Sequence, residues 1–379
     1  AVPTLATTAD ARLSIDQRVQ QAFAAFSEEM VEQRYDVMLG KVPAARIQTI
    51  SPLNTARQSR SAAGLAAIHQ VVASGSLPYT IYYGNMHSQT NHSDGGSPVG
   101  SCSGSEVPQA GTMGPSDAYT MMRVQAGGDF LLTSEHNHMY DGSTGTNASA
   151  VPANANALFN SGLQQAAAAR SANPDFMALY GLEWGVISNG GHLNIINPDV
   201  LTEWEYNGSG QLIGGVFTAK SDYPALYALM KQRGWIGQFN HPASSGQFLV
   251  NGVALGYDAN GGEVMVLAEV LNSSAFSTNT TQTETGRSTY TAAWNKLLEA
   301  GYHVAPSSDQ DNHCANWGLS FTNRTGVLLP SGTPLTTAAF FDALRARRTF
   351  ATEDRSGQLV LTGNGHVMGE SFANSGPLT

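Results

Sequence analysis

Short apolar runs alternate with longer helix-like stretches from about residue 80 to residue 313, and this alternation predicts the fold class. The apolar runs have the length and content of strands, and they read YTIYYG, DFLLTS, DFMALYGLEW, HLNIINP, WIGQFNHP, VMVLAEVLN and HVAPSSD. Helix-like stretches precede four of them and end in glycine or Asn-Pro, as helices commonly do; they read PSDAYTMMRVQAG, ALFNSGLQQAAAARSANP, YPALYALMKQRG and STYTAAWNKLLEAG. Because helix and strand alternate, we expect an α/β fold with a parallel sheet or a (β/α) barrel.

The chain before residue 80 has a different pattern. Between Asp10 and about Leu39, apolar residues recur at spacings of three and four, which predicts a packing helix. The run AAGLAAIHQVVAS predicts a second, short helix, and we interpret its His69 as structural. We therefore expect residues 1–75 to form an N-terminal helical extension.

Nearly every predicted strand ends in residues of types that bind metals. In chain order these residues are His87, Gln89, His92, Asp94, Glu135, His136, His138, Glu183, His192, His241, Glu269, Asn272, Asp309, Asp311 and His313. Active sites of (β/α) barrels lie where the strands end, so these side chains are expected to meet. Seven of the ten histidines fall at such ends, which indicates a metal site rather than histidines scattered over a surface.

Composition narrows the classes of protein that fit. Hydrophobic residues make up 41% of the 379 residues, enough for a sizeable core, whereas charged residues make up only 13%. The net charge is −10 and there is no run of lysine or arginine, which argues against a nucleic-acid groove. No stretch approaches the ~18 apolar residues of a membrane span. The opening AVPTLATTADA is typical of a terminus left by signal-peptide cleavage, so we expect a secreted or periplasmic bacterial protein.

Six motifs in chain order carry a resemblance to a known family. They are GNMHSQTNHSDG (84–95), SEHN (134–137), GLE (181–183), a strand histidine (192), HP (241–242) and SDQD (308–311). Together they resemble the polymerase and histidinol phosphatase (PHP) family of metal-dependent hydrolases, over roughly residues 80 to 355. The resemblance implies a distorted (β/α)7 barrel at residues 76–355, followed by a short C-terminal β segment at residues 356–379.

The resemblance also implies two to three divalent ions of zinc, manganese or iron. The first ion would be held by His87, Glu183 and Asp309. Whether Gln89 also binds this ion stays open. The second would be held by Glu183 as a bridge, His192 and His241. The third would be held by Asp94, His136 and either Asp311 or His313. Because a water between two bridged cations loses a proton near neutral pH, Glu183 and Asp309 are also predicted to be catalytic.

Two positions depart from the family pattern. Gln89 stands where the family has the second histidine of H-x-H, and a neutral amide oxygen is a poor zinc ligand compared with imidazole. Asp311 stands where the closing motif has histidine, so either Asp311 binds the ion or His313 replaces it. More oxygen among the ligands favours manganese or iron over zinc at one position, and the identity of the metal stays open.

Several other polar residues have a possible role at the site, and for some of them two interpretations stay open. His138 is either a general acid for the leaving group, and so catalytic, or a histidine that lies at the surface or supports the ligands from behind. His92 and Glu135 are expected to orient ligands. Arg287 and Arg324 either clamp a phosphate or form surface ion pairs.

The two cysteines, Cys102 and Cys314, follow the first motif and the last. If both loops line one metal site, the two sulfurs lie close enough to bond. We therefore predict a disulfide that joins these loops, in keeping with an oxidising compartment. Two free thiols are the alternative.

The function implied by the resemblance is that of a phosphoesterase that cleaves small phosphomonoesters or diesters by attack of a metal-bridging hydroxide. The C-terminal segment LRARRTFATEDRSGQLVLTGNGHVMGESF resembles the secreted carbaryl-hydrolase-like branch, so a carbamate, ester or amide hydrolase is the first alternative. A non-catalytic extracellular metal-binding protein is the second. The expected partner is a small-molecule substrate, and its identity, the bond cleaved and the oligomeric state stay open.

Overall fold

The structure is a computed structural model that describes residues 78–242, 249–250, 253–254 and 256–377. All of these residues belong to one unit of the chain, Ser51–Thr379. The helix predicted between Asp10 and Leu39, the helix around His69 and the extension predicted at residues 1–75 lie outside the described residues.

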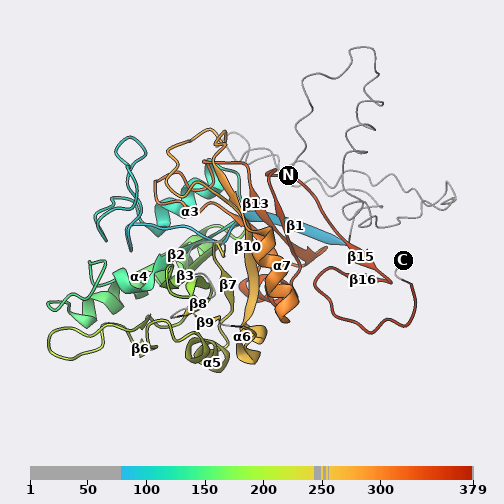
Figure 1. Ribbon diagram of the computed structural model, residues 1–379. Coiled ribbons are helices and arrows are strands. Elements are labelled where there is room, and N and C mark those ends of the chain that lie inside the picture. Colours follow the sequence, from blue (N-terminus) through green and yellow to red (C-terminus); the bar gives the residue numbers. More distant parts are fainter. Residues whose placement is uncertain (1–77, 243–248, 251–252, 255, 378–379) are drawn as a thin grey trace, which may run out of the picture. The chain divides into compact units, whose positions relative to one another are not determined.

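A ten-stranded mixed sheet lies at the centre of this unit and curls into a half-barrel (Figure 1). Its strands in spatial order are β11 (Arg287–Thr289), β10 (Met265–Ser273), β7 (Gly237–Phe239), β4 (Gly191–Ile195), β3 (Met177–Val186), β2 (Phe130–His136), β1 (Tyr79–Asn85), β13 (Arg324–Pro330) and β14 (Thr349–Thr352), with β12 (Ala305–Asp309) paired to β10. The predicted α/β class is confirmed, because helices separate many of these strands along the chain.

Strand direction agrees with the barrel prediction only in part. β1, β2 and β3 pair in parallel, and so do β7, β10 and β12, as the alternation of helix and strand predicts. β4 instead pairs antiparallel with both β3 and β7, because only residues 187–190 connect β3 to β4 and leave no length for a crossover helix. β13 also pairs antiparallel with both of its neighbours, β1 and β14. The predicted count of seven β/α units is therefore not confirmed.

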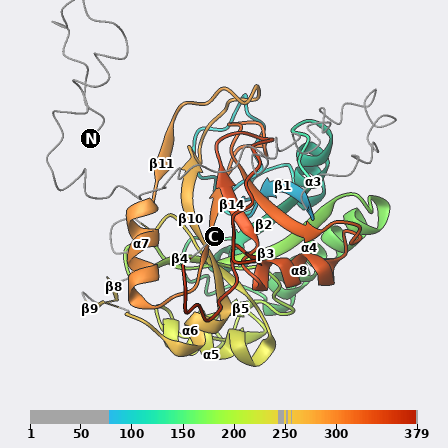
Figure 2. The same cartoon turned by 90° about the vertical axis from the view of Figure 1, so that its right-hand side faces the viewer.

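Six α-helices occur in the part of the chain that the structure describes. They are α3 (Pro115–Val124), α4 (Pro152–Ala172), α5 (Tyr223–Arg233), α6 (Ala259–Val264), α7 (Thr291–Ala300) and α8 (Thr337–Arg345). The pairs α3 with α4 and α5 with α6 lie side by side (Figures 1 and 2). The sequence pattern predicted α3, α4, α5 and α7. Of these, α5 and α7 end at Gly234 and Gly301 in the left-handed conformation that glycine adopts without steric cost.

The remaining elements are short. They are η3 (Asn137–Met139), β5 (Thr202–Glu203), β6 (Val216–Phe217), β8 (Leu249–Val250), β9 (Val253–Ala254), β15 (Thr362–Gly363) and β16 (His366–Val367). The last two form an antiparallel pair within the predicted C-terminal β segment. Within the described ranges, we find no helix with the length and hydrophobicity that a membrane crossing requires.

Side chains on one face of each central strand change from apolar to polar toward its carboxyl end. On β2, Phe130 and Leu132 pack in a buried cluster that includes Phe340 of α8. The same face continues to Ser134 and His136, which are also buried. β3 repeats this order with Met177, Leu179, Gly181 and Glu183. The predicted ligand side chains therefore stand on an apolar core that fills the inside of the half-barrel.

β12 brings distant parts of the sheet together. Its backbone pairs with β10, and its Ser308 donates its N–H to Thr325 Oγ1 of β13 at 2.8 Å. Asn85 Nδ2, at the end of β1, donates to Ser308 O at 3.2 Å. As a result the segment after β1, which carries His87, meets β10, which carries Glu269, and the end of β12, which carries Asp309.

Candidate metal centre

Glu183, near the end of β3, is the carboxylate around which the predicted ligands gather. It is 1% exposed, and its two oxygens face four imidazoles. Oε1 lies 3.0 Å from His192 Nδ1 and 3.2 Å from His241 Nε2. Oε2 lies 3.1 Å from His87 Nε2 and 3.5 Å from His136 Nδ1. The residue predicted to bridge two ions thus lies between four histidines that the sequence also singled out.

Three groups of side chains could each hold an ion. Within each group, the potential ligand atoms lie within 4.8 Å of one another. These groups are His87–Glu183–His241, His136–Glu183–His192 and Asp94–His136–His313. Glu183 and His136 each belong to two groups. Ions held in neighbouring groups would therefore share a ligand.

The group around Asp94 has the spacing that a bound ion requires. Asp94 Oδ1 lies 3.7 Å from His136 Nε2 and 3.6 Å from His313 Nε2, too far for hydrogen bonds. This buried oxygen has no hydrogen-bond partner among the described residues. Ligand atoms at about 2.1 Å from a tetrahedral ion lie about 3.4 Å from one another. The donor set and its spacing therefore fit a divalent ion.

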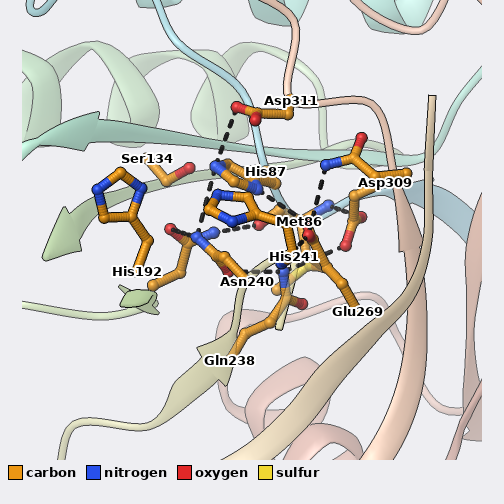
Figure 3. Close-up of polar contacts among 12 residues, drawn as sticks. Met86, His87, Ser134, His192, Gln238, Asn240, His241, Glu269, Asp309 and Asp311 are labelled. Atoms are coloured by element: carbon orange, nitrogen blue, oxygen red, sulfur yellow. Dashed lines mark hydrogen bonds and ion pairs between the residues drawn. The ribbon is translucent and has the colours of Figure 1, made fainter. Parts of the chain in front are cut away.

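The two candidates for the last ligand lie in different places. His313 belongs to the group around Asp94. Asp311 Oδ1 instead lies 3.1 Å from His87 Nε2, as Figure 3 shows. Asp311 and His241 have φ angles of 50° and 30°, in a region that residues other than glycine seldom adopt. Such backbone strain is concentrated at functional sites, because the surrounding structure must hold it in place.

Asp309 belongs to none of the three groups. Its Oδ1 accepts a hydrogen bond from the backbone N–H of Met86 at 2.5 Å, and its Oδ2 accepts from Gln238 Nε2 at 3.2 Å. In Figure 3, Asp309 and His192 lie on opposite sides of His87. Burial, followed by repulsion from Glu269, raises the pKa of Asp309 to about 7. The structure thus does not bring Asp309 into a group with His87 and Glu183, and its carboxylate instead joins the end of β1 to β7.

Gln89 lies in the cluster but presents a hydrogen-bond donor. Its Nε2 donates to Glu183 Oε2 at 2.7 Å, and its Oε1 accepts from Ser93 Oγ at 3.0 Å. The amide oxygen, the only atom of this side chain that binds cations, therefore faces Ser93.

Glu269 and Asn240, to which the sequence assigned no ion, hold the ligands in place. Glu269 Oε1 lies 2.7 Å from His87 Nδ1, and its Oε2 accepts from the backbone N–H of His241 at 2.6 Å. A carboxylate on Nδ1 fixes the tautomer in which Nε2 of His87 is free to bind a cation. Asn240 Nδ2 donates to Glu183 Oε1 at 2.9 Å. Glu269 is among the strand-end residues that the sequence singles out, and Asn240 directly precedes His241, so the same rule was able to find it.

Burial and neighbouring charges shift the pKa values of the cluster in opposite directions. Burial alone would raise the pKa of Glu183, but His87, His192 and His136 hold it well below 4.5. Burial alone would lower the pKa of His87, but Asp311, Glu183 and Glu269 raise it well above 6.5. At His136 burial dominates and lowers the pKa. In the absence of a cation, protonated imidazole compensates the carboxylates, so binding of a divalent ion would release protons.

His138, His92 and Glu135 lie around the groups without joining them. Burial, followed by the charges of His136 and His192, lowers the pKa of His138 to about 3, which works against a general acid at neutral pH. His92 Nδ1 is hydrogen-bonded to Tyr180 OH at 2.6 Å. Burial raises the pKa of Glu135 to about 7. Its two oxygens accept hydrogen bonds from the backbone N–H and the hydroxyl of Thr90, so it supports the loop that leads to Asp94.

The two arginines do not reach the cluster. Arg287 forms an ion pair with Glu353 at 3.0 Å, in agreement with the surface reading. Arg324 is 1% exposed and donates to the carbonyls of Gly318 and Asn323 at 2.9 and 2.7 Å. Both readings of Arg324 are therefore wrong, because its guanidinium holds buried loop carbonyls.

The predicted disulfide between Cys102 and Cys314 is confirmed, and the alternative of two free thiols is wrong. It connects two loops that also pair at Ser97 and Cys314. Cys314 follows His313 directly, and the loop of Cys102 follows Asp94. The bond thus holds together the two segments that supply Asp94 and His313, two of the three members of the group Asp94–His136–His313.

The described residues define an α/β protein with a buried cluster of histidines and carboxylates that can hold metal ions. No family model and no curated protein matches the sequence. Among solved structures, the fold is similar to a two-domain protein from Bacteroides vulgatus ATCC 8482 that contains a predicted PHP-like metal-dependent phosphoesterase, with a TM-score of 0.43 and 15% identity over 73% of this chain. The chain spans 66% of that protein, just under two thirds of its length. It is also similar to PsfC from Pseudomonas syringae PB-5123, with a TM-score of 0.37 and 12% identity over 72% of this chain and 91% of PsfC. Such low TM-scores assign neither a family nor an activity.

Proposed function

We propose that this protein is a metal-dependent hydrolase, and specifically a phosphoesterase that acts on small phosphomonoesters or diesters. The observation that carries the proposal is the sharing of Glu183 and His136, each between two candidate ion groups. Adjoining cations suit a phosphoryl group, which offers several oxygens and gains negative charge as it reacts. Zinc, manganese and iron are the candidate metals.

The residues of the chain would supply the geometry of the reaction. A divalent ion, when bound, polarises the phosphoryl oxygens and lowers the pKa of coordinated water. Asn240 and Gln89 each donate an N–H to one oxygen of Glu183, and Glu269 fixes the ring of His87. Because these supporting side chains are buried, the ligands are held in place before the substrate arrives.

Two further points belong to the proposal. Export to an oxidising compartment is supported by the disulfide. The resemblance of the C-terminal segment to the secreted carbaryl-hydrolase-like branch stays a prediction and keeps carbamates among the substrates to be tested.

The test is hydrolysis of para-nitrophenyl phosphate, bis(para-nitrophenyl) phosphate and an aryl carbamate by protein stripped with a chelator and then supplied with each metal. We expect turnover of a phosphoester that depends on added metal. Glu183→Ala should abolish turnover with an unchanged circular dichroism spectrum. Glu263→Ala, at a surface residue paired with Lys231, should not. Turnover of the carbamate alone would identify a carbamate hydrolase instead of a phosphoesterase. A folded, metal-loaded protein without any turnover would contradict the proposal.

A further inference from the structure

A row of side chains leads from the metal groups to a lysine. The rings of His136 and His138 lie 5.8 Å apart. His138 stacks on Trp204 at 5.5 Å, with the planes 21° apart. The Nζ atom of Lys220 lies 5.6 Å from the centre of the Trp204 ring. An ammonium group is therefore held beside the site by an indole, outside the ligand groups themselves.

The charge of Lys220 has no close acidic partner. Lys220 is exposed, and among the described residues no carboxylate oxygen lies within 4.0 Å of its Nζ. Lys231 and Arg233, on α5 just beyond it, are both paired with carboxylates. Lys220 acts electrostatically on Glu205 and His138 without forming an ion pair with Glu205. Its ammonium is thus available to a ligand.

Glu205, on which Lys220 acts electrostatically, belongs to a group of three neighbouring carboxyl groups. Asp141, Glu203 and Glu205 lie close enough together to repel one another. The whole chain carries a net charge of −10. With this net charge, a second anionic group of a substrate would bind weakly unless a cation received it. Lys220, held over Trp204 by a cation–π contact, is placed to do so.

We propose that Lys220 binds a second anionic group of the substrate, so that the site selects phosphoesters that carry another negative charge some distance from the phosphoryl group. Trp204 acts as a positioning residue that holds the ammonium. The proposal rests on the proposed function, because the phosphoryl group itself would be held at the metal groups.

The test uses alkyl phosphates that end either in a carboxylate or in the isosteric carboxamide, namely phosphooxyhexanoate, phosphooxyoctanoate and their amides. For the metal-loaded wild type, kcat/KM should favour the carboxylate over the amide. Lys220→Gln should lower this ratio by about two- to fivefold, the range that one exposed ion pair supplies. Trp204→Leu should lower the ratio in part, whereas Lys231→Gln should leave it unchanged. The proposal is overturned if Lys220→Gln leaves the ratio of acid to amide unchanged. An equal loss of kcat/KM on both substrates would give that result.

Binding separates this proposal from the proposed function. Calorimetric titration of the metal-loaded protein with phosphooxyoctanoate and with its amide needs no turnover. If the wild type binds the acid more tightly and Lys220→Gln removes the difference, the inference about Lys220 stands even when no ester is cleaved. Equal binding of acid and amide by the wild type overturns it. Absence of turnover alone counts only against the proposed function.

Discussion

The side-chain amide of Gln89 donates a 2.7 Å hydrogen bond to Glu183 Oε2. The other close polar neighbours of this oxygen are two imidazoles, of His87 and His136. The Ser93 hydroxyl lies 3.0 Å from the Gln89 oxygen and orients the amide with its nitrogen toward the carboxylate. At the position where the PHP resemblance implies a histidine ligand, the side chain therefore supports a carboxylate.

Replacing Gln89 with histidine should tighten zinc binding. An imidazole at this position offers the cluster one more nitrogen ligand, and zinc prefers such a ligand to an amide. We expect the Kd for zinc, measured by competition with a chelating dye, to fall by about tenfold or more, on the scale of one ligand contact. Gln89→Leu is the matched control, because it removes the donor without adding a ligand, and it should not tighten binding. An unchanged Kd in Gln89→His would show that this side chain does not face the ions.

Glu269 should prove necessary for metal affinity although it belongs to none of the three groups. Without its carboxylate at 2.7 Å from Nδ1, the His87 ring loses its fixed tautomer. Loss of such an orienting partner typically weakens metal binding by about 10- to 100-fold, which we expect for Glu269→Ala. Glu353→Ala, at a surface residue paired with Arg287, is the control. Equal affinity of the two variants for zinc would argue that Glu269 only fills space.

The disulfide should contribute substantially to stability. It closes a loop with a sequence separation of 212 residues, and constraints on such long loops reduce the entropy of the unfolded chain. Loss of the bond is expected to cost about 2 to 5 kcal/mol. Thermal unfolding of Cys102→Ser/Cys314→Ser, with and without reductant, measures this. Reductant should lower the Tm of the wild type and leave that of the variant unchanged. A wild-type Tm that does not respond to reductant, with thiol titration confirming that the bond is cleaved, would count against a stabilising role.

His92 should make stability fall with decreasing pH. Burial lowers the pKa of His92 to about 4, below its ordinary value of 6.5, so the folded state favours the neutral ring. This contribution to stability is complete above pH 6.5 and is lost as the pH falls from 6.5 toward 4. Between about pH 7 and pH 5, with a chelator present, the wild type should lose about 1 to 2 kcal/mol more than His92→Gln. Urea unfolding at the two pH values measures the difference, and parallel losses in both proteins would mean that the ring does not stay neutral.

Strand ends could be read from the sequence because two simple patterns coincide there. Apolar runs mark the buried strands, and the residues that follow them lie at one rim of a curled sheet. This pattern predicts that His87, Glu183 and His241 meet, and the three lie in one group. It also found the disulfide, since both cysteines adjoin such rims.

The direction of β4 and the orientation of single side chains could not be read in the same way. The run HLNIINP predicts a strand, but only the length of the link from β3 decides that it runs antiparallel. Asp309 ends β12 as predicted, yet its oxygens accept hydrogen bonds from Met86 and Gln238, which come from other strands. A position at a strand end is a local property of sequence. The partner of a side chain depends on strands that are distant along the chain.

Glu183 is the one residue that the candidate ion groups His87–Glu183–His241 and His136–Glu183–His192 share. The number of zinc ions bound per chain, measured by equilibrium dialysis and elemental analysis, tests this claim most directly. The wild type should bind two or three ions, because three overlapping groups are present. Glu183→Ala should keep only one, since the group Asp94–His136–His313 does not include Glu183. A wild type without stoichiometric zinc, or a Glu183→Ala variant that binds as many ions as the wild type, would contradict the account.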